Sequence, residues 1–209
     1  MKYHGPPLRQ FVYLSMAMVL ICGCSRDYES IVAVNNTNPD SGKRAFTDVM
    51  GDAAKEFVDL ERMEVEVDSS EIKVTLDLVN IPPLLLFNHD ALANNLLNYS
   101  WHAIFDLDSN NQLSLNDLLL AVNRFKVPNV AQFEGDLLSN TQHGLWEGTG
   151  NGARFIAHIS ASVTGDKIEM VFDKADADSL FAKIHPSTNI IFETYFYDGV
   201  MEAEDRFPD

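Results

Sequence analysis

The sequence predicts an all-β fold, an antiparallel sandwich of two sheets with only minor helix. Three observations support this prediction. Apolar and polar residues alternate with a period of two in several segments, and turn residues separate these segments at hairpin spacing. The chain also carries 13 Phe, 6 Tyr and 2 Trp, which is enough aromatic volume for a core between two sheets.

The first predicted strands form a hairpin. Met63, Val65 and Val67 alternate with acidic residues, and residues 68–70 (Asp-Ser-Ser) then predict a turn. The returning segment 72–78 repeats the alternation, with Ile and Val followed by two Leu on one face. We therefore expect one face of both strands to be buried.

The second half of the chain predicts more strands. Residues 155–163 alternate as one strand, residues 164–167 (Thr-Gly-Asp-Lys) have the composition of a hairpin turn, and apolar positions in 168–172 return. Residues 190–197 are β-branched and aromatic, which predicts a central strand. A short helical turn or loop is expected at 180–181.

The N-terminus predicts an export signal. Lys2 and Arg9 precede an apolar run at 11–21, which is too short to span a bilayer. The next residues, Ile21 to Cys24 (I-C-G-C), resemble the lipobox of bacterial lipoproteins. That resemblance implies cleavage after Gly23 and a lipid on Cys24; an ordinary secretory signal is the alternative. Ser25, where Asp would favour inner-membrane retention, favours the outer membrane of a Gram-negative bacterium.

The chain divides into three parts. We expect a signal peptide at 1–23, a polar tether at 24–45 and one folded domain at 46–209. The protein would lie in the cell envelope, with the membrane as a partner through the lipid on Cys24.

Composition excludes some partners and some kinds of site. A net charge of −16 excludes nucleic acid as a partner. Cys22 and Cys24 are the only cysteines, so neither a disulfide framework nor a zinc cluster can form.

A candidate metal site lies at residues 106–117, D-L-D-S-N-N-Q-L-S-L-N-D. Short oxygen-bearing side chains at alternate positions of such a loop converge on one calcium ion. The segment resembles the twelve-residue EF-hand loop, and the ligands expected on it are Asp106, Asp108, Asn110, Gln112, Ser114 and Asp117. Gln112 would bind through its backbone carbonyl and Ser114 through a water molecule, while Leu113 would hold the loop against the core.

Two positions of this loop depart from the EF-hand pattern. Asn111 stands where Gly is usual and tolerates the left-handed conformation at some cost. Asp117 replaces the usual Glu and reaches less far, so we expect weak binding with a dissociation constant of roughly 10⁻⁴–10⁻³ M. The alternative is a solvated acidic turn that holds no ion.

The flanks of the loop allow two folds. Apolar residues in 115–125 also have helical spacing, which would give an α+β fold with an EF-hand helix–loop–helix. Residues 101–107 instead alternate as a strand. We favour strands on both sides, because of a resemblance that covers the whole domain.

Short motifs follow one another from Phe46 to the C-terminus. They are F-x-D-x-x-G-D at 46–52, Asp59-Leu60 at the start of a strand, an aromatic-rich segment at 99–108 and D-x-x-P-D at 205–209. In this order they resemble the secreted β-sandwich modules grouped with DOMON and carbohydrate-binding-module-like domains. The resemblance implies strands around the acidic loop and a binding or accessory role.

No catalytic site is recognisable in the sequence. It contains no G-x-S-x-G, H-E-x-x-H or phosphate-loop motif, and we interpret residues 202–205 as part of a solvated acidic tail. We therefore expect no enzyme, but a calcium-binding, lipid-anchored envelope module whose partner is a glycan or an envelope protein. A surface enzyme domain acting on a glycan is the alternative, and a purely structural lipoprotein is a third interpretation.

Overall fold

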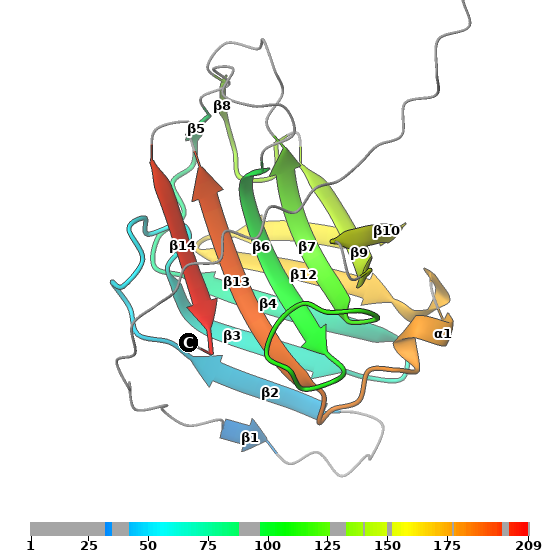
Figure 1. Ribbon diagram of the computed structural model, residues 1–209. Coiled ribbons are helices and arrows are strands. Elements are labelled where there is room, and N and C mark those ends of the chain that lie inside the picture. The colour runs from blue at the N-terminus through cyan, green and yellow to red at the C-terminus, as the bar shows by residue number, and fades with distance from the viewer. Residues whose placement is uncertain are drawn as a thin grey trace, which may run out of the picture.

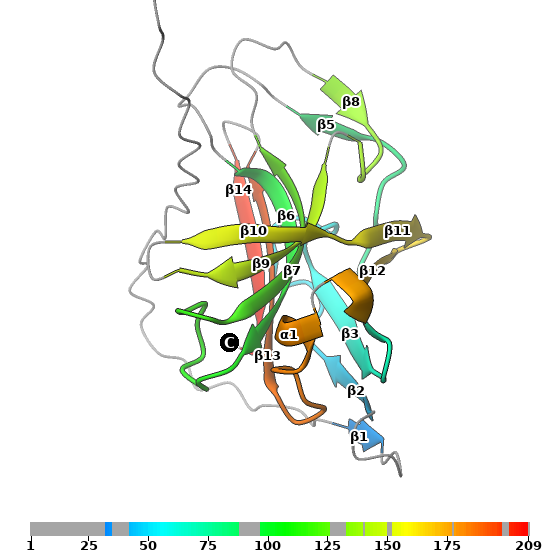
Figure 2. The ribbon, with the colours of Figure 1, turned by 90° about the vertical axis from the view of Figure 1, so that its right-hand side faces the viewer.

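The predicted strands assemble into two antiparallel sheets that pack face to face (Figures 1 and 2). The computed structural model describes residues 32–34, 42–87, 97–125, 133–139, 141–149, 152–176, 178–197 and 201–208. Each large sheet has six strands, and a two-stranded ribbon extends from one end of the sandwich. The prediction of an all-β sandwich is thus confirmed.

The first sheet has the strand order β1-β2-β3-β4-β12-β11. Its strands are, in that order, Val32–Val34, Gly42–Thr47, Leu60–Val67, Glu71–Leu78, Lys167–Asp173 and Ser160–Thr164. The hairpins β3–β4 and β11–β12 are those predicted from alternation. The second turns at Gly165, whose φ of 60° is a conformation that suits glycine.

The second sheet has the order β10-β9-β7-β6-β13-β14. Its strands are Ala153–His158, Gln142–Gly148, Leu118–Phe125, Leu97–Asp106, Asn189–Tyr197 and Glu202–Phe207. β13 lies between β6 and β14, as expected of a central strand. The acidic loop joins β6 to β7, so the helix–loop–helix alternative is wrong.

The remaining elements are small. The ribbon pairs β5 (Leu85–Phe87) with β8 (Phe133–Gly135). A 3₁₀ turn (Lys174–Asp176) and α1 (Asp178–Phe181) lie where a short helical turn was expected. No helix in the described part of the chain has the length and hydrophobicity that crossing a bilayer requires.

Two boundaries differ from the sequence prediction. Residues 155–163 are not one strand: β10 ends at His158 in the second sheet, and β11 begins at Ser160 in the first. Ile159, between them, is buried, and the apolar alternation continues through it without a break. The first sheet also begins inside the predicted tether 24–45, because β1 and most of β2 lie there. The sequence did not indicate β2 as a strand, because Arg44 occupies an inward position and interrupts the apolar alternation.

The core fills the space between the sheets. Its largest fully buried side chains include Trp101, Tyr99 and Phe105 of β6, with Phe172 and Phe192 opposite and beside them. A smaller apolar cluster lies on the other face of the second sheet, because its members alternate with the core positions of their strands. This outer cluster consists of Ile104, Leu119, Ala121, Trp146 and Ile191.

Side chains of the second sheet also hold the segment that enters β3. The Trp101 Nε1–H donates to the Phe57 carbonyl at 3.0 Å, and the Thr194 hydroxyl donates to the Val58 carbonyl. The Leu60 amide donates to Oδ2 of Asp205, in β14, at 2.6 Å. Backbone groups that the β3 ladder does not reach are therefore paired across the sandwich.

A Thr194→Val substitution tests this inter-sheet bonding. It keeps the shape of the side chain but leaves the buried Val58 carbonyl without its donor, so we expect a loss of about 1–3 kcal/mol in the free energy of unfolding. Thr75→Val, on the outer side of β4, is the matched control and should change stability by no more than about 0.5 kcal/mol. Urea denaturation of both variants measures the difference, and equal losses would contradict the interpretation.

Candidate metal centre

The acidic loop is fixed at both ends by the β6–β7 ladder. Phe105 pairs with Leu118, Asp106 is the last residue of β6, and Asp117 directly precedes β7. The Asp106 and Asp117 side chains are only 2% and 0% exposed. One carboxylate oxygen from each of Asp106, Asp108 and Asp117 lies within 4.8 Å of the other two. The structure thus brings together the three acidic residues that the sequence singled out.

Backbone amides hold the two buried carboxylates in place. Asp106 accepts hydrogen bonds from the amides of Asn110 (3.2 Å) and Asn111 (2.9 Å). Asp117 accepts from Leu107 (2.8 Å) and Ser114 (2.6 Å). An ionised carboxylate has about four acceptor sites, so two amide bonds leave room for a cation.

The other predicted ligands gather around Asp108, which is exposed. Its Oδ2 accepts from the Ser114 hydroxyl at 2.9 Å and from the Asn110 side-chain amide at 3.0 Å. Oδ1 of Asn110 accepts in turn from the Gln112 backbone amide at 3.0 Å. The third, fifth and ninth positions of the loop are therefore in contact, whereas a metal role for the Gln112 carbonyl stays a prediction.

The loop backbone already has the conformation that tight wrapping requires. Asn111, at the sixth position, has a φ of 60°, as expected for the residue that replaces Gly. Ser109 (58°) and Asn116 (74°) also have positive φ, which the sequence had not indicated for them. The left-handed conformation at these three positions turns the chain sharply enough for the carboxylates to converge.

Residues of β9 and β14 contact the loop from outside. The Asn116 amide donates to the Gly148 carbonyl at 3.0 Å, and the Gly148 amide donates to the Asp117 carbonyl at 2.9 Å. A Cβ at Gly148 would lie 1.8 Å from the Ser114 carbonyl oxygen, so only glycine fits there. Leu113 packs against the buried outer cluster. The Arg206 guanidinium donates to the Asn111 carbonyl.

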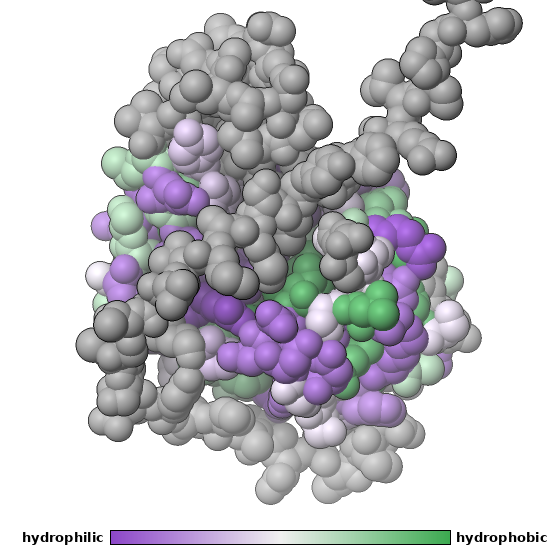
Figure 3. All heavy atoms as spheres, viewed as in Figure 1, coloured by the Kyte–Doolittle hydropathy of each residue, from purple (hydrophilic) through white to green (hydrophobic). Residues whose placement is uncertain are grey.

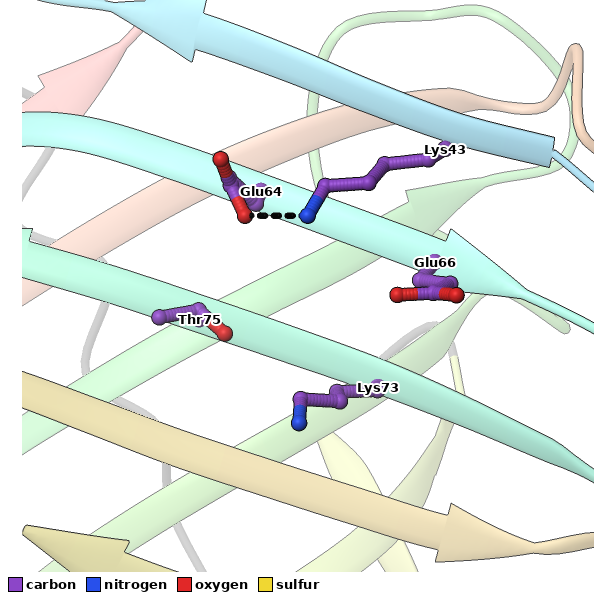
Figure 4. Close-up of a pocket in the computed structure, with 5 residues that line it drawn as sticks. All are labelled: Lys43, Glu64, Glu66, Lys73 and Thr75. Carbon is purple, nitrogen blue, oxygen red and sulfur yellow. Dashed lines mark ion pairs between the residues drawn. The ribbon is translucent and has the colours of Figure 1, made fainter.

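A shallow hollow on the outer side of the first sheet has a different character (Figure 4). Lys43, Glu64, Glu66, Lys73 and Thr75 line it, from β2, β3 and β4. Lys43 pairs with Glu64 at 2.8 Å, and this hydrogen bond lowers the pKa of the Glu64 carboxyl. Lys73 pairs with Glu169 at 2.6 Å. Opposite charges alternate over these strands, as on a solvated sheet face.

Comparisons with protein-family models, curated proteins and solved structures find no match to this chain. The assignment of a site therefore depends on its geometry. The predicted lipidation site, Cys24, and the signal peptide lie outside the described residues.

A Gly148→Ala substitution tests the contact between β9 and the loop. The new methyl group would collide with the Ser114 carbonyl, so the Asn116 amide should lose its hydrogen bond and exchange faster with solvent. Gly165→Ala strains a turn in the other sheet, where nothing lies within 4 Å, and should leave Asn116 protected. Amide hydrogen exchange followed by NMR measures both variants; unchanged protection in Gly148→Ala would contradict the contact.

Proposed function

We propose that this protein is a calcium-binding β-sandwich module of the bacterial cell envelope, anchored by a lipid on Cys24, with a binding or accessory role. The observation that carries the proposal is the convergence of Asp106, Asp108 and Asp117 on a loop whose backbone is already wrapped. Calcium is the ion of choice because every available donor is oxygen and because its coordination geometry is flexible. Magnesium requires tight octahedral geometry and gives up its waters reluctantly.

Calcium at this loop would stabilise the end of the second sheet. Three carboxylates in a small loop repel one another, and a divalent cation removes that repulsion. Leu113 lies between the expected ligands Gln112 and Ser114 and contacts the outer cluster. An ordered loop would therefore hold the outer cluster in one arrangement as well.

The outer face of the second sheet supports a binding role. Phe155, Tyr195 and Tyr197 are half-buried on the outward sides of β10 and β13, and Phe155 packs edge-on against the buried Trp146 with ring centroids 5.2 Å apart. Figure 3 looks onto this face and shows hydrophobic residues gathered at its lower right, bordered by hydrophilic ones. Aromatic rings beside polar groups suit a glycan or a polypeptide partner.

The enzyme alternative has less support. A glycoside hydrolase needs two carboxyl groups on either side of the substrate, and one of them must stay protonated through a raised pKa. In the hollow of Figure 4, Lys43 instead lowers the pKa of Glu64. The geometry therefore favours binding over catalysis at this surface.

Calcium should raise the melting temperature of the protein. At a calcium concentration 100 times the dissociation constant, mass action stabilises the folded state by about 2.7 kcal/mol. For a domain of this size, that corresponds to a shift of roughly 5–11 °C. Thermal unfolding in calcium, in magnesium and in chelator measures the effect, and magnesium should produce a smaller shift. Equal melting temperatures in calcium and chelator would refute calcium binding.

A pair of matched variants assigns the shift to the loop. Asp108→Ala should remove the part of the shift that the loop supplies. Asp173→Ala is the control: Asp173 is also exposed, and like Asp108 it accepts a hydrogen bond from the amide two residues ahead. The control should keep the full calcium shift. A full shift in Asp108→Ala would place the ion elsewhere.

The anchor is tested separately. Cys24→Ala removes the thiol that would carry the lipid, so the variant should leave the membrane fraction and appear in the soluble fraction of the envelope. Mass spectrometry of the wild-type N-terminus should find lipid on Cys24. A mature protein that begins at another residue without lipid would contradict the lipoprotein assignment.

A further inference from the structure

A second group of carboxylates lies away from the acidic loop. Asp52 belongs to the connection between β2 and β3, Asp59 directly precedes β3, and Asp205 lies in β14 of the other sheet. One carboxylate oxygen of each lies within 4.8 Å of the other two. Asp205, interpreted from the sequence as part of a solvated tail, is in fact only 8% exposed.

Asp59 carries an oxygen that no group of the described residues satisfies. The residue is 2% exposed, and its Oδ2 accepts a hydrogen bond from the Gly51 amide at 2.8 Å. Its Oδ1 is buried and has no hydrogen-bond partner within the described part of the chain. A buried carboxylate oxygen without a donor is costly unless a ligand completes it.

The two buried members of this group have no cationic partner among the described residues. None of the ion pairs within the described ranges includes Asp59 or Asp205. Asp205 accepts only amides, from Leu60 at 2.6 Å and Arg206 at 2.7 Å. The carboxyl groups of Asp59 and Asp205 thus lie close to each other in a poorly solvated place.

We propose that Asp52, Asp59 and Asp205 bind a second divalent cation, which joins the start of β3 in one sheet to β14 in the other. Oxygen is the only donor the three side chains offer, and this favours calcium as it does in the loop. The unpartnered Oδ1 of Asp59 supplies the ligand atom that is already desolvated. This site is independent of the loop and does not rest on the function proposed for it.

A catalytic pair is the other arrangement that two close carboxyl groups suggest. A glycosidase pair must stand on either side of a sugar, which requires an open cleft. Asp59 and Asp205 are almost completely covered. Asp59 accepts a hydrogen bond from Gly51 in the β2–β3 connection, and Asp205 accepts one from Leu60 in β3. A small ion fits such a place, whereas a glycan does not.

Calcium titration of the purified full-length protein in detergent tests the proposal. After treatment with chelator, isothermal titration calorimetry with calcium chloride should find two ions per chain in the wild type and one in Asp108→Ala, which lacks the loop site. In the Asp108→Ala background, Asp52→Asn should weaken the remaining site at least about tenfold, since ligand charge tunes calcium affinity. Asp52 is exposed, so this variant should fold. Glu61→Gln, an exposed acid on β3, is the matched control and should not change binding.

The outcomes separate the two sites. One ion in the wild type and none in Asp108→Ala would overturn the second site and leave the loop site standing. One ion in both proteins, weakened by Asp52→Asn, would support the second site and refute the first. No binding at all would refute both, and an Asp108→Ala site that Asp52→Asn leaves unchanged would also overturn the proposal. Circular dichroism of each variant verifies that the sheets are intact.

Discussion

The structure depends on the way one short stretch of backbone obtains its hydrogen bonds. Residues 57–60 lead into β3 at the edge of the sandwich, where buried carbonyls and amides must be paired. Trp101, Thr194 and Asp205, all from the opposite sheet, provide the partners. These bonds fix where β3 begins and hold the two sheets in a fixed position relative to each other. They also place Asp59 beside Asp205.

Strand β14 connects the two acidic groups. Its successive residues point to opposite faces of the sheet, so Asp205 faces the interior while Arg206 contacts the Asn111 carbonyl of the acidic loop. Arg206 also lies 3.5 Å from Glu193 on the neighbouring strand. A displacement of this strand would therefore move Asp205 and one support of the acidic loop together.

Local sequence patterns predict the parts of this protein that local forces determine. The β3–β4 hairpin, the turn at Gly165 and the left-handed Asn111 follow from alternation and from the preferences of single residues. The crossing at Ile159 was missed because an inward-facing apolar residue looks the same whichever sheet it serves. The Asp59–Asp205 contact was missed because no spacing marks a pair so far apart in the chain, and the acidic surroundings of Asp205 made it resemble solvated surface.

The hydrogen bond between Leu60 and Asp205 spans 145 residues. A contact between residues this far apart in the sequence closes a very large loop. Because closing that loop costs chain entropy, the contact forms late and slows folding. Asp205 also leaves the ribosome long after Leu60. Until then, the entry to β3 lacks its acceptor, and β13, which β14 covers at the side of the second sheet, stays an open edge that can pair with other chains. The last strand thus acts as the closing element, and truncating it would leave an aggregation-prone chain rather than a slightly shorter protein.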